Sequence, residues 1–466
     1  MTFEFYPAKI FGMPILTDSK NFIANEFLNL KLGDKRLSKR AIEVVTLINA
    51  GPSFSIPAMA NGNNGDLKGL YRFFRNDKVD DQKLLETHYL NTLERMLAYG
   101  GKILLLNDTC FVSPAKNCAG LLTRGKGKEN CVRVHYCLAI SEDGKHIFGI
   151  LNYNALIDPI SERYPELKNE SDIWVFTARS CIDLILASTN GKKLLSRCLF
   201  VGDRESDEFE LINFLTENNL GFIIRSQYNR PSFIDGCELN LNEIEVKSKK
   251  HGESYSIKTQ IEKKLVDVVV KRSVLRNIQI IPPNDFKKYF LPIKVNVVLV
   301  KDIETDGNQV KWRLYTSEEI NNSAKSQFVV ESYAHRWKIE EVNKGAKTGV
   351  NVEERQFQKL EHFLPFLAMG FVVAWRLVSL RTVVEVSPRT AIKKAFTPEE
   401  VEYMKEQAKT FDLPMKTVKD GLYLIARLGG FTSSYERPGW QILWQGWIKF
   451  FERVEGFILA KKMFQK

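Results

Sequence analysis

Four side chains in one stretch of the chain could act together on a phosphate group. The pattern of residues 333–347 predicts a helix, and at about 100° per residue Tyr333, Arg336, Glu340 and Lys347 fall within roughly a 60° arc. A carboxylate flanked by two cations and a phenol suits an acid that holds a metal ion beside a phosphate, with Arg and Lys binding that phosphate. A solvated helix face with salt bridges between turns is the alternative.

The choice of acid within this helix follows from its geometry. Glu341 would point about 100° further round than Glu340, away from the Tyr-Arg-Lys cluster. We therefore expect Glu340 to be the metal ligand. Lys344 lies close to the same arc and is expected to share the phosphate-binding face.

Two aspartates follow apolar runs that predict buried strands. Asp108 comes after residues 102–107, and Asp203 comes after residues 198–202. In open α/β sheets, functional groups collect at the carboxyl ends of strands. Three carboxylates from separate elements would repel one another unless they bound divalent cations, and two Mg²⁺ ions about 3.5–4 Å apart could activate a water or a 3′-hydroxyl. A turn or helix cap is the alternative for each aspartate alone.

The surrounding segments predict a mixed α/β sheet. Residues 132–140 and 146–153 flank a turn at 142–144 and predict a hairpin, a helix is expected over 173–188 and a strand over 221–225.

Residues from about 227 to 310 are Lys-rich and strand-prone, so we interpret them as a β-rich insertion. Residues 312–317 then return to the sheet.

Both ends of the chain predict helices. Asp34 is expected to cap a helix whose first turns carry Arg36, Lys39 and Arg40, cations that could lie along a DNA backbone or be merely solvated. The tail, about 398–466, carries aromatics at near-regular helical spacing. They could pack in a core, but we favour a dimerisation surface because so aromatic an end helix needs a partner.

Composition narrows the class of partner. The formal net charge of +11 and pI near 9.1 favour a polyanion, with nucleic acid the first expectation. The first residues show no secretory signal, and the apolar run 363–375 predicts a buried helix too short to span a bilayer. Seven cysteines without a CxxC pair indicate neither disulfides nor zinc. We expect a protein of the reducing cytoplasm that does not associate with membranes.

The spacing of Tyr333, Arg336, Glu340 and Lys347 matches a Y-x2-R-x3-E-x6-K signature. By this motif, and by the settings of Asp108 and Asp203, the chain resembles bacterial DDE transposases of the insertion-sequence-four family, the Tn-five cut-and-paste type. The resemblance covers nearly the whole chain.

The resemblance implies three domains. These are a helical DNA-binding domain over 1–95, a ribonuclease H-like catalytic domain over 96–385 with the insertion inside it, and a helical dimerisation domain over 386–466. It also implies binding to transposon ends, strand nicking, hairpin formation and resolution, and strand transfer into target DNA by a homodimer.

The resemblance further implies a role for each candidate residue. The residues expected to hold two Mg²⁺ or Mn²⁺ ions are Asp108, Asp203 and Glu340. Those expected to bind DNA are Tyr333, Arg336, Lys347, Lys344, Arg225, Arg36, Lys39, Arg40 and Trp312. Trp312 would stack on a flipped base, and its alternative is an ordinary core tryptophan.

Three other functions remain open from the sequence. A non-catalytic DNA-binding derivative would bind ends without cutting them, and a structure-specific nuclease would cut without strand transfer. A structural protein without a ligand would give no reason for three spaced carboxylates.

Overall fold

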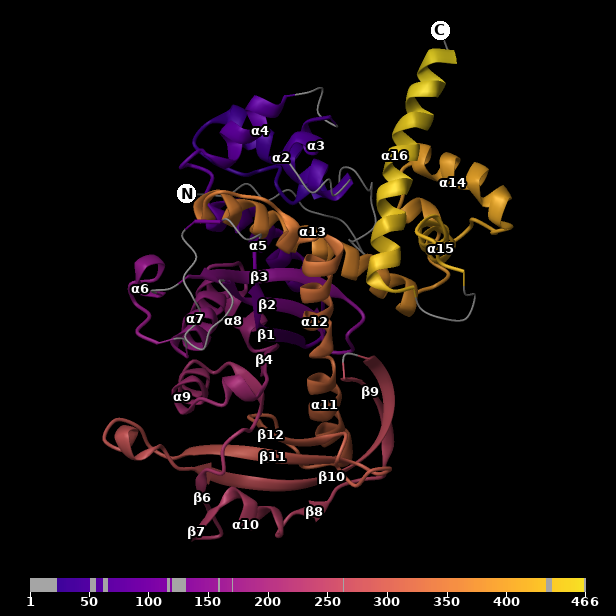
Figure 1. Cartoon of the computed structure of the whole chain (residues 1–466). Helices are drawn as coiled ribbons and strands as arrows, with labels where there is room; N and C mark the ends of the chain where they lie inside the picture. Colours follow the sequence, from indigo (N-terminus) through magenta and orange to yellow (C-terminus); the bar gives the residue numbers. More distant parts are fainter. Residues whose placement is uncertain are drawn as a thin grey trace. The chain divides into compact units, whose positions relative to one another are not determined.

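The computed structural model (Figure 1) describes most of the chain. The described residues are 23–50, 56–61, 66–114, 118–119, 131–157, 160–169, 171–262, 264–432 and 438–464. The chain divides into two compact units. Residues 1–88 and 344–466 form the first unit, and residues 89–343 form the second.

The second unit is built on a mixed sheet that has twelve strands among the described residues, in the order β3-β2-β1-β4-β5-β12-β11-β10-β6-β7, with β8 and β9 also paired to β10. The strands are β1 Ile103–Val112, β2 Val132–Ser141, β3 Ile147–Leu156, β4 Cys198–Gly202, β5 Gly221–Arg225, β6 Pro231–Ile234, β7 Cys237–Asn240, β8 Lys249–Lys250, β9 Tyr255–Ile261, β10 Lys264–Ile280, β11 Ile293–Asp302 and β12 Lys311–Thr316. β1 pairs in parallel with β4, and β4 with β5, whereas β2 is antiparallel to both of its neighbours. The fold class is therefore α/β with a mixed sheet.

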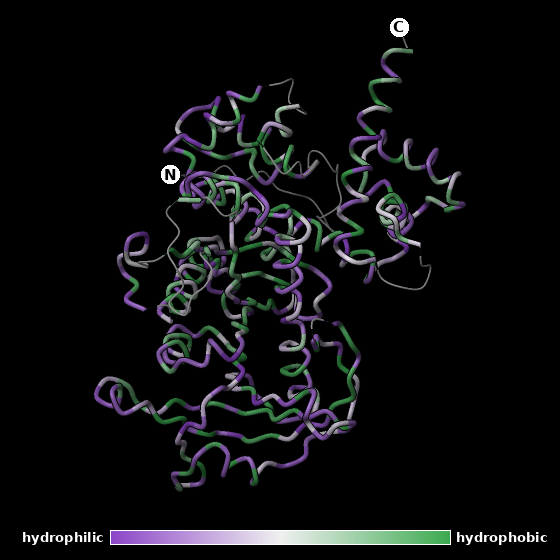
Figure 2. The backbone as a smooth tube through the Cα atoms, viewed as in Figure 1, coloured by the Kyte–Doolittle hydropathy of each residue, from purple (hydrophilic) through white to green (hydrophobic). Residues whose placement is uncertain are grey.

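Helices in the second unit cover and connect these strands. They are α6 Ile160–Arg163, α7 Asp172–Leu186, α8 Gly191–Leu195, α9 Phe209–Glu217, α10 Leu241–Glu245, α11 Ser323–Ala334 and α12 Trp337–Lys344, while α5 Asp81–Ala98 crosses the division between the units. A large core cluster joins the inner faces of α7 and α9 to β1, β4 and β5. Figure 2 shows hydrophobic residues concentrated along the central strands.

Most of the predicted elements near the carboxylates are confirmed. β2 and β3 form the hairpin, and its turn contains Gly144 at φ +65°, a conformation that glycine adopts without strain. The helix α7 and the strands β4 and β5 also match their predicted ranges within two residues.

The predicted end of the first strand is wrong. β1 continues through Asp108 to Val112, because β2 pairs with it along its whole length, including Asp108 opposite Tyr136. The parallel partner β4, in contrast, accompanies β1 only as far as Leu106, which pairs with Val201. Asp108 therefore lies beyond the parallel part of the sheet but not beyond the strand.

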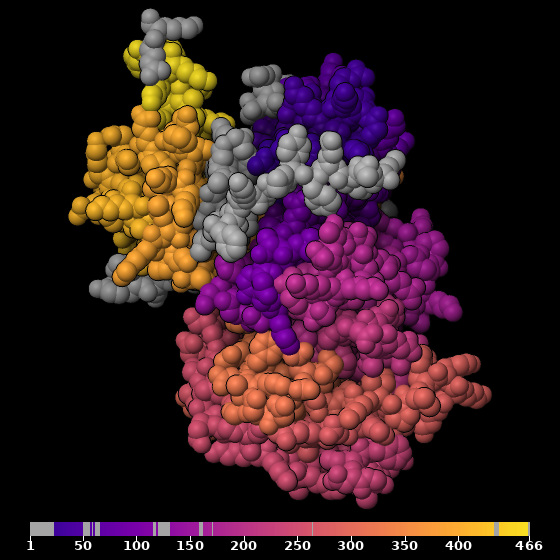
Figure 3. Space-filling model, turned by 180° about the vertical axis from the view of Figure 1, so that it is seen from behind, coloured from indigo at the N-terminus to yellow at the C-terminus, as the bar shows by residue number. Residues whose placement is uncertain are grey.

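The segment after β5 is strand-rich, as expected, and its strands join the same sheet. β12 pairs with β5, where Leu314 lies opposite Arg225, and β11 and β10 follow as further antiparallel strands. The turn between β10 and β11 projects from the surface in the space-filling view (Figure 3).

In the first unit the described elements are helical. They are α2 Lys35–Ala50, α3 Ile56–Asn61, α4 Leu67–Phe74, α13 Leu360–Val386, α14 Pro398–Phe411, α15 Val418–Leu428 and α16 Trp440–Phe464, with short turns η3 Gly345–Gly349, η4 Val352–Glu354 and η5 Ile392–Lys394. Asp34 caps α2 as expected, since its carboxylate accepts the Arg36 N–H at 2.8 Å.

The apolar run 363–375 lies in a longer helix than predicted. α13 has 27 residues and is long and apolar enough to cross a membrane, so the expectation of a helix too short to do so is wrong. The expectation of burial is confirmed, because the apolar window of this helix is entirely buried.

The aromatic stripe of the tail divides into two parts. Trp444, Trp447, Phe450 and Phe451 are buried within the first unit, so core packing accounts for that half of the stripe. The final turns of α16 instead expose three apolar side chains: Leu459, Met463 and Phe464. Within the described part of α16, this exposed end is the candidate contact surface.

Candidate active site

Three elements of the second unit present the predicted carboxylates. Asp108 lies on β1 and Asp203 follows β4, each two residues beyond the last shared pair of these parallel strands, Leu106 with Val201. Glu340 lies in the first turn of α12, where the helix dipole favours a negative charge. The parallel pairing therefore explains why two aspartates far apart in the sequence come to the same end of the sheet.

Arg336 joins two of these carboxylates. Its guanidinium forms an ion pair with Glu340, and its Nη1 lies 3.8 Å from Oδ2 of Asp108. Burial acts to lower the pKa of Arg336, but the Tyr333 oxygen and the carboxylates of Asp108, Glu340 and Asp203 raise it overall. Arg336 is therefore a permanent cation that partly neutralises the acidic cluster.

The pKa of Asp108 is strongly perturbed. Burial raises the pKa of Asp108 to about 7, and the negative charges of Asp203 and Glu340 act in the same direction, whereas Arg336 opposes them. The three acids are thus near enough to affect one another electrostatically. Perturbation by burial together with specific charges is typical of functional sites, although structural ion-pair networks also produce it.

The arrangement is not that of a formed metal site. In the described part of the chain, no group of three or more His, Cys, Asp or Glu side chains stands in a position to hold a metal ion. Carboxylate oxygens are the ligands that Mg²⁺ prefers, so the side chains present are of a suitable type. Two of the three acids, Asp108 and Glu340, are however in contact with Arg336. In this structure the cluster is partly neutralised by the Arg336 guanidinium.

The predicted continuous helix over 333–347 is wrong. α11 ends at Ala334, a turn containing Arg336 follows, and α12 begins at Trp337. The N–H groups of Arg336 and Ile339 bond three residues back, which tightens the turn but keeps its hand, so Arg336 still reaches Glu340 four residues on. Beyond Lys344 the chain widens into a π-helical turn.

Tyr333, Trp312 and Arg225 form the neighbouring part of the site. The rings of Tyr333 and Trp312 meet edge to face with centroids 4.9 Å apart, and Trp312 is only 8% exposed. Arg225 ends β5, and its charge and that of Arg336 act to lower the pKa of Tyr333, which burial nevertheless raises overall. Trp312 is packed as a core tryptophan in this state.

Sequence reasoning missed two residues that position Asp108. The Asn343 side chain donates to Oδ2 of Asp108 at 3.2 Å and accepts a hydrogen bond from the Tyr136 hydroxyl at 2.8 Å. The Tyr136 hydroxyl is also 3.0 Å from the carbonyl oxygen of Ile339. A signal was present: Asn343 lies one helical turn after Glu340, and the predicted hairpin places Tyr136 on the strand beside β1.

A buried ion pair connects the loops that follow β4 and β5. Asp207 accepts hydrogen bonds from the N–H groups of Gln227 and Tyr228, at 2.7 and 3.0 Å, and from Nε of Arg230 at 3.2 Å. Asp207 and Arg230 are both buried. This pair fixes the loop after Asp203 to the loop after Arg225.

The remaining candidate cations lie in the first unit. Lys344 ends α12, and Lys347 lies in η3 with its Nζ 3.4 Å from Glu353. On α2, Arg36 and Lys39 are exposed. Arg36 forms an ion pair with Asp34 at 3.3 Å, and Arg40 forms ion pairs with Glu43 and Asp66.

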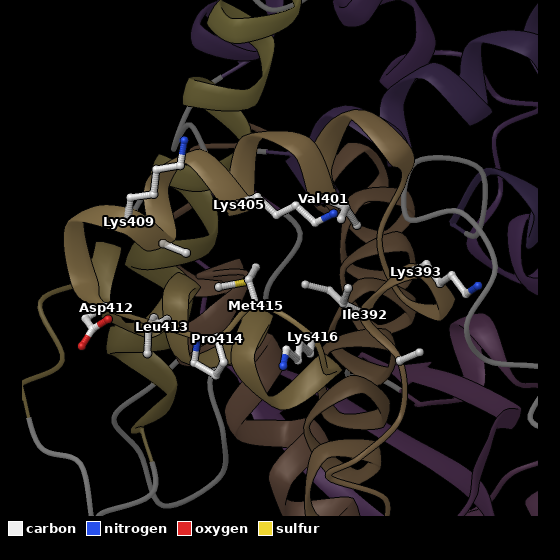
Figure 4. A pocket seen from close by; sticks show the side chains of 12 residues that line it. Ile392, Lys393, Val401, Lys405, Lys409, Asp412, Leu413, Pro414, Met415 and Lys416 are labelled. Atoms are coloured by element: carbon white, nitrogen blue, oxygen red, sulfur yellow. The ribbon is translucent and has the colours of Figure 1, made fainter.

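A separate surface hollow of about 760 Å³ occurs within residues 391–416 (Figure 4). Its floor is apolar, and four lysines line it: Lys393, Lys405, Lys409 and Lys416. None of the three carboxylates lines this hollow. It is a basic surface feature, distinct from the acidic cluster.

The N-terminal region matches a known family. Residues 19–79 match the family model described as transposase DNA-binding. The match covers α2 to α4, and therefore Arg36, Lys39 and Arg40. The chain thus carries a transposase DNA-binding domain near its N-terminus.

Proposed function

We propose that this protein is a DDE transposase of the insertion-sequence-four family, an enzyme that binds transposon ends and moves them by cut-and-paste transposition. The observation that carries the proposal is geometric: Asp108 and Asp203 lie at the same end of the parallel strands β1 and β4, and Arg336 lies against both Asp108 and Glu340. They occur in a chain that also has a transposase DNA-binding domain.

A ribonuclease H-like catalytic domain is part of the proposal. The strand order β3-β2-β1-β4-β5 supports it, with one antiparallel strand and helices connecting the parallel ones. The strands β6 to β11 would be the insertion. The exposed end of α16 would contribute to dimerisation on DNA.

The three carboxylates would hold Mg²⁺ or Mn²⁺. When bound, the metal would activate the attacking hydroxyl and stabilise the leaving oxygen of a phosphodiester. Nicking, hairpin formation, hairpin opening and strand transfer are all phosphoryl transfers, so one site could serve each in turn.

The other residues of the site would position DNA. Arg336 would exchange its carboxylate partners for a phosphate, since a guanidinium binds either anion through the same paired N–H groups. Tyr333, Lys347 and Lys344 would bind neighbouring phosphates, and Arg225 the backbone of the DNA end. Trp312 would leave its contact with Tyr333 to stack on a flipped base, with a stacking energy of about 1–3 kcal/mol.

A cleavage assay tests this proposal. The full chain is incubated with Mg²⁺ or Mn²⁺ and DNA carrying the element's own ends, and nicks, hairpins and strand-transfer products are resolved on gels. We expect Glu340→Gln to reduce cleavage by about 100-fold or more, because even partners of metal ligands change activity by about 10–100-fold. End binding should change little.

Glu341→Gln is the matched control, because it removes the same charge one residue further along. It should retain cleavage. Binding without metal-dependent cleavage by the wild type would contradict the enzymatic proposal and favour a non-catalytic DNA-binding derivative. Cleavage without joining to target DNA would favour a structure-specific nuclease.

A further inference from the structure

The turn between β10 and β11 carries exposed lysines and exposed apolar side chains that have no role in the proposed chemistry. We define the hairpin tip as residues 282–292, which join these two long antiparallel strands. Pro282 and Pro283 precede its short helical turn, Asn284–Phe286, and Pro292 follows it. Because proline fixes its own φ, the two sides of the tip have little backbone freedom.

Internal packing sets the shape of the hairpin tip. The Phe290 ring lies 5.9 Å from the ring of Phe286 and 5.9 Å from that of Phe209 on α9. The N–H groups of Phe286 and Phe290 bond to carbonyl oxygens three and four residues earlier, at 2.9 and 3.0 Å. Two of the apolar side chains are therefore used to hold the tip against the body of the second unit.

Most of the other side chains of the tip face solvent, including those of Asn284 and Asp285. Tyr289 is 75% exposed and Leu291 is 82% exposed. Lys287 and Lys288 are also exposed, and neither has an ion-pair partner among the described residues. The segment projects from the second unit in both views (Figures 1 and 3).

We propose that the hairpin tip is a second DNA-binding surface, one that binds duplex DNA irrespective of sequence. Lys287 and Lys288 would bind phosphates, and Tyr289 and Leu291 would pack against the sugars and base edges exposed in a groove. Exposed lysines beside a free aromatic ring are the combination that backbone-tracking DNA surfaces use.

Charge and context favour DNA over another occupant. The chain has a net charge of +11 and a transposase DNA-binding domain, so DNA is a ligand it meets. Lysine is depleted in the cores of protein–protein interfaces, which makes the adjacent pair Lys287 and Lys288 unsuited to the centre of one. Sequence independence would follow because contacts of Lys287 and Lys288 with phosphates carry no direct sequence information.

The test measures binding of the full chain to a fluorescent duplex that lacks the element's ends, by anisotropy over a salt series. Glu340→Gln serves as the background, so that the result does not depend on catalysis. Lys287→Ala with Lys288→Ala should reduce the slope of log K against log salt by about 1.8, since each phosphate contact contributes about 0.9. Tyr289→Ala should weaken binding by roughly fivefold or more, because it removes apolar surface that would be buried in the groove.

The matched control replaces Lys192 and Lys193 with alanine. They are also adjacent and exposed, and they lie on α8 of the same unit but without an exposed aromatic neighbour. This control should leave the slope unchanged. An unchanged slope and affinity in the tip variants would overturn the proposal.

A sedimentation assay with anionic phospholipid vesicles separates DNA from a lipid surface. We expect no binding that depends on the tip. Vesicle binding lost in Tyr289→Ala, with duplex binding retained, would also overturn the proposal. Neither result bears on cleavage at the element's ends, so this inference and the proposed function can fail independently.

Discussion

Opposing effects determine the charge of the Asp108 carboxyl group. Burial and the charges of Asp203 and Glu340 favour its neutral form, while Arg336 favours its charged form. Asn343, held by Tyr136, donates to it and fixes its orientation. The side chain is thus kept in place by neutral hydrogen-bonding partners while its charge depends on pH.

This environment predicts an unusual pH dependence of stability. The pKa of Asp108 is about 7 in the folded protein and near 3.8 when unperturbed. Between these values the folded state holds a proton that the unfolded state has lost, so the free energy of unfolding falls as pH rises through this window. Asp108→Asn removes the titration. The free energy of unfolding of this variant, measured relative to that of the wild type, should therefore rise by a few kcal/mol between pH 5 and pH 8. The magnitude follows from about 1.4 kcal/mol per pKa unit.

Urea unfolding of both proteins at the two pH values, with EDTA present, measures this difference. The other titrating groups, including the buried His135, occur in both proteins and cancel in the comparison. A difference between the proteins that is the same at pH 5 and pH 8 would show that Asp108 titrates near its ordinary pKa.

At the scale of elements, the loops after β4 and β5 depend on one buried ion pair. The Asp207 carboxylate accepts hydrogen bonds from the backbone N–H of Gln227, in the loop after β5, and from Nε of Arg230. The same two loops adjoin Asp203 and Arg225, so the pair supports the site without belonging to it. Breaking it should disturb both loops together.

Arg230→Met leaves Asp207 buried without its cation. Removing one partner of a buried pair costs about 3–5 kcal/mol, because the remaining charge is uncompensated. Chemical denaturation should therefore show a large loss of stability. Lys271→Met is the control, since its partner Asp306 is exposed and surface pairs contribute about 0–1 kcal/mol. Equal effects of the two variants would mean that Arg230 and Asp207 are not held as a buried pair.

At the scale of the whole molecule, the first unit combines both ends of the sequence, because residues 1–88 and 344–466 belong to it. The DNA-binding match and α16 are thus parts of one unit. Inside that unit, Trp444, Trp447 and Phe450 serve the core. At the end of α16, in contrast, three apolar side chains are exposed: Leu459, Met463 and Phe464.

We predict that two copies assemble on DNA through this end. Light scattering after size-exclusion chromatography should show a monomer without DNA and a dimer with transposon ends. Leu459→Ser with Phe464→Ser should abolish the dimer and retain binding to a single end. Phe411→Ser, a less exposed apolar position on α14, should not affect assembly. A stable dimer in the absence of DNA would contradict the prediction.

The sequence by itself determined the local elements and singled out the acids as candidates. Alternating apolar residues and turn residues act over a few positions, so the hairpin of β2 and β3, the helix α7 and the end of β4 at Gly202 could be predicted. The position of Asp203 after a strand followed directly. The contact of Arg336 with Glu340 could also be inferred, because it depends only on a four-residue separation.

Only the tertiary structure decided the features that depend on long-range pairing. Asp108 lies within its strand because β2 accompanies β1 further than β4 does. Asn343 and Tyr136 meet Asp108 because α12 packs beside that strand. The aromatics of α16 could belong to a core or an interface, since periodicity gives a face but not its neighbour. Burial and register are properties of the assembled sheet and helices, and a local pattern does not contain them.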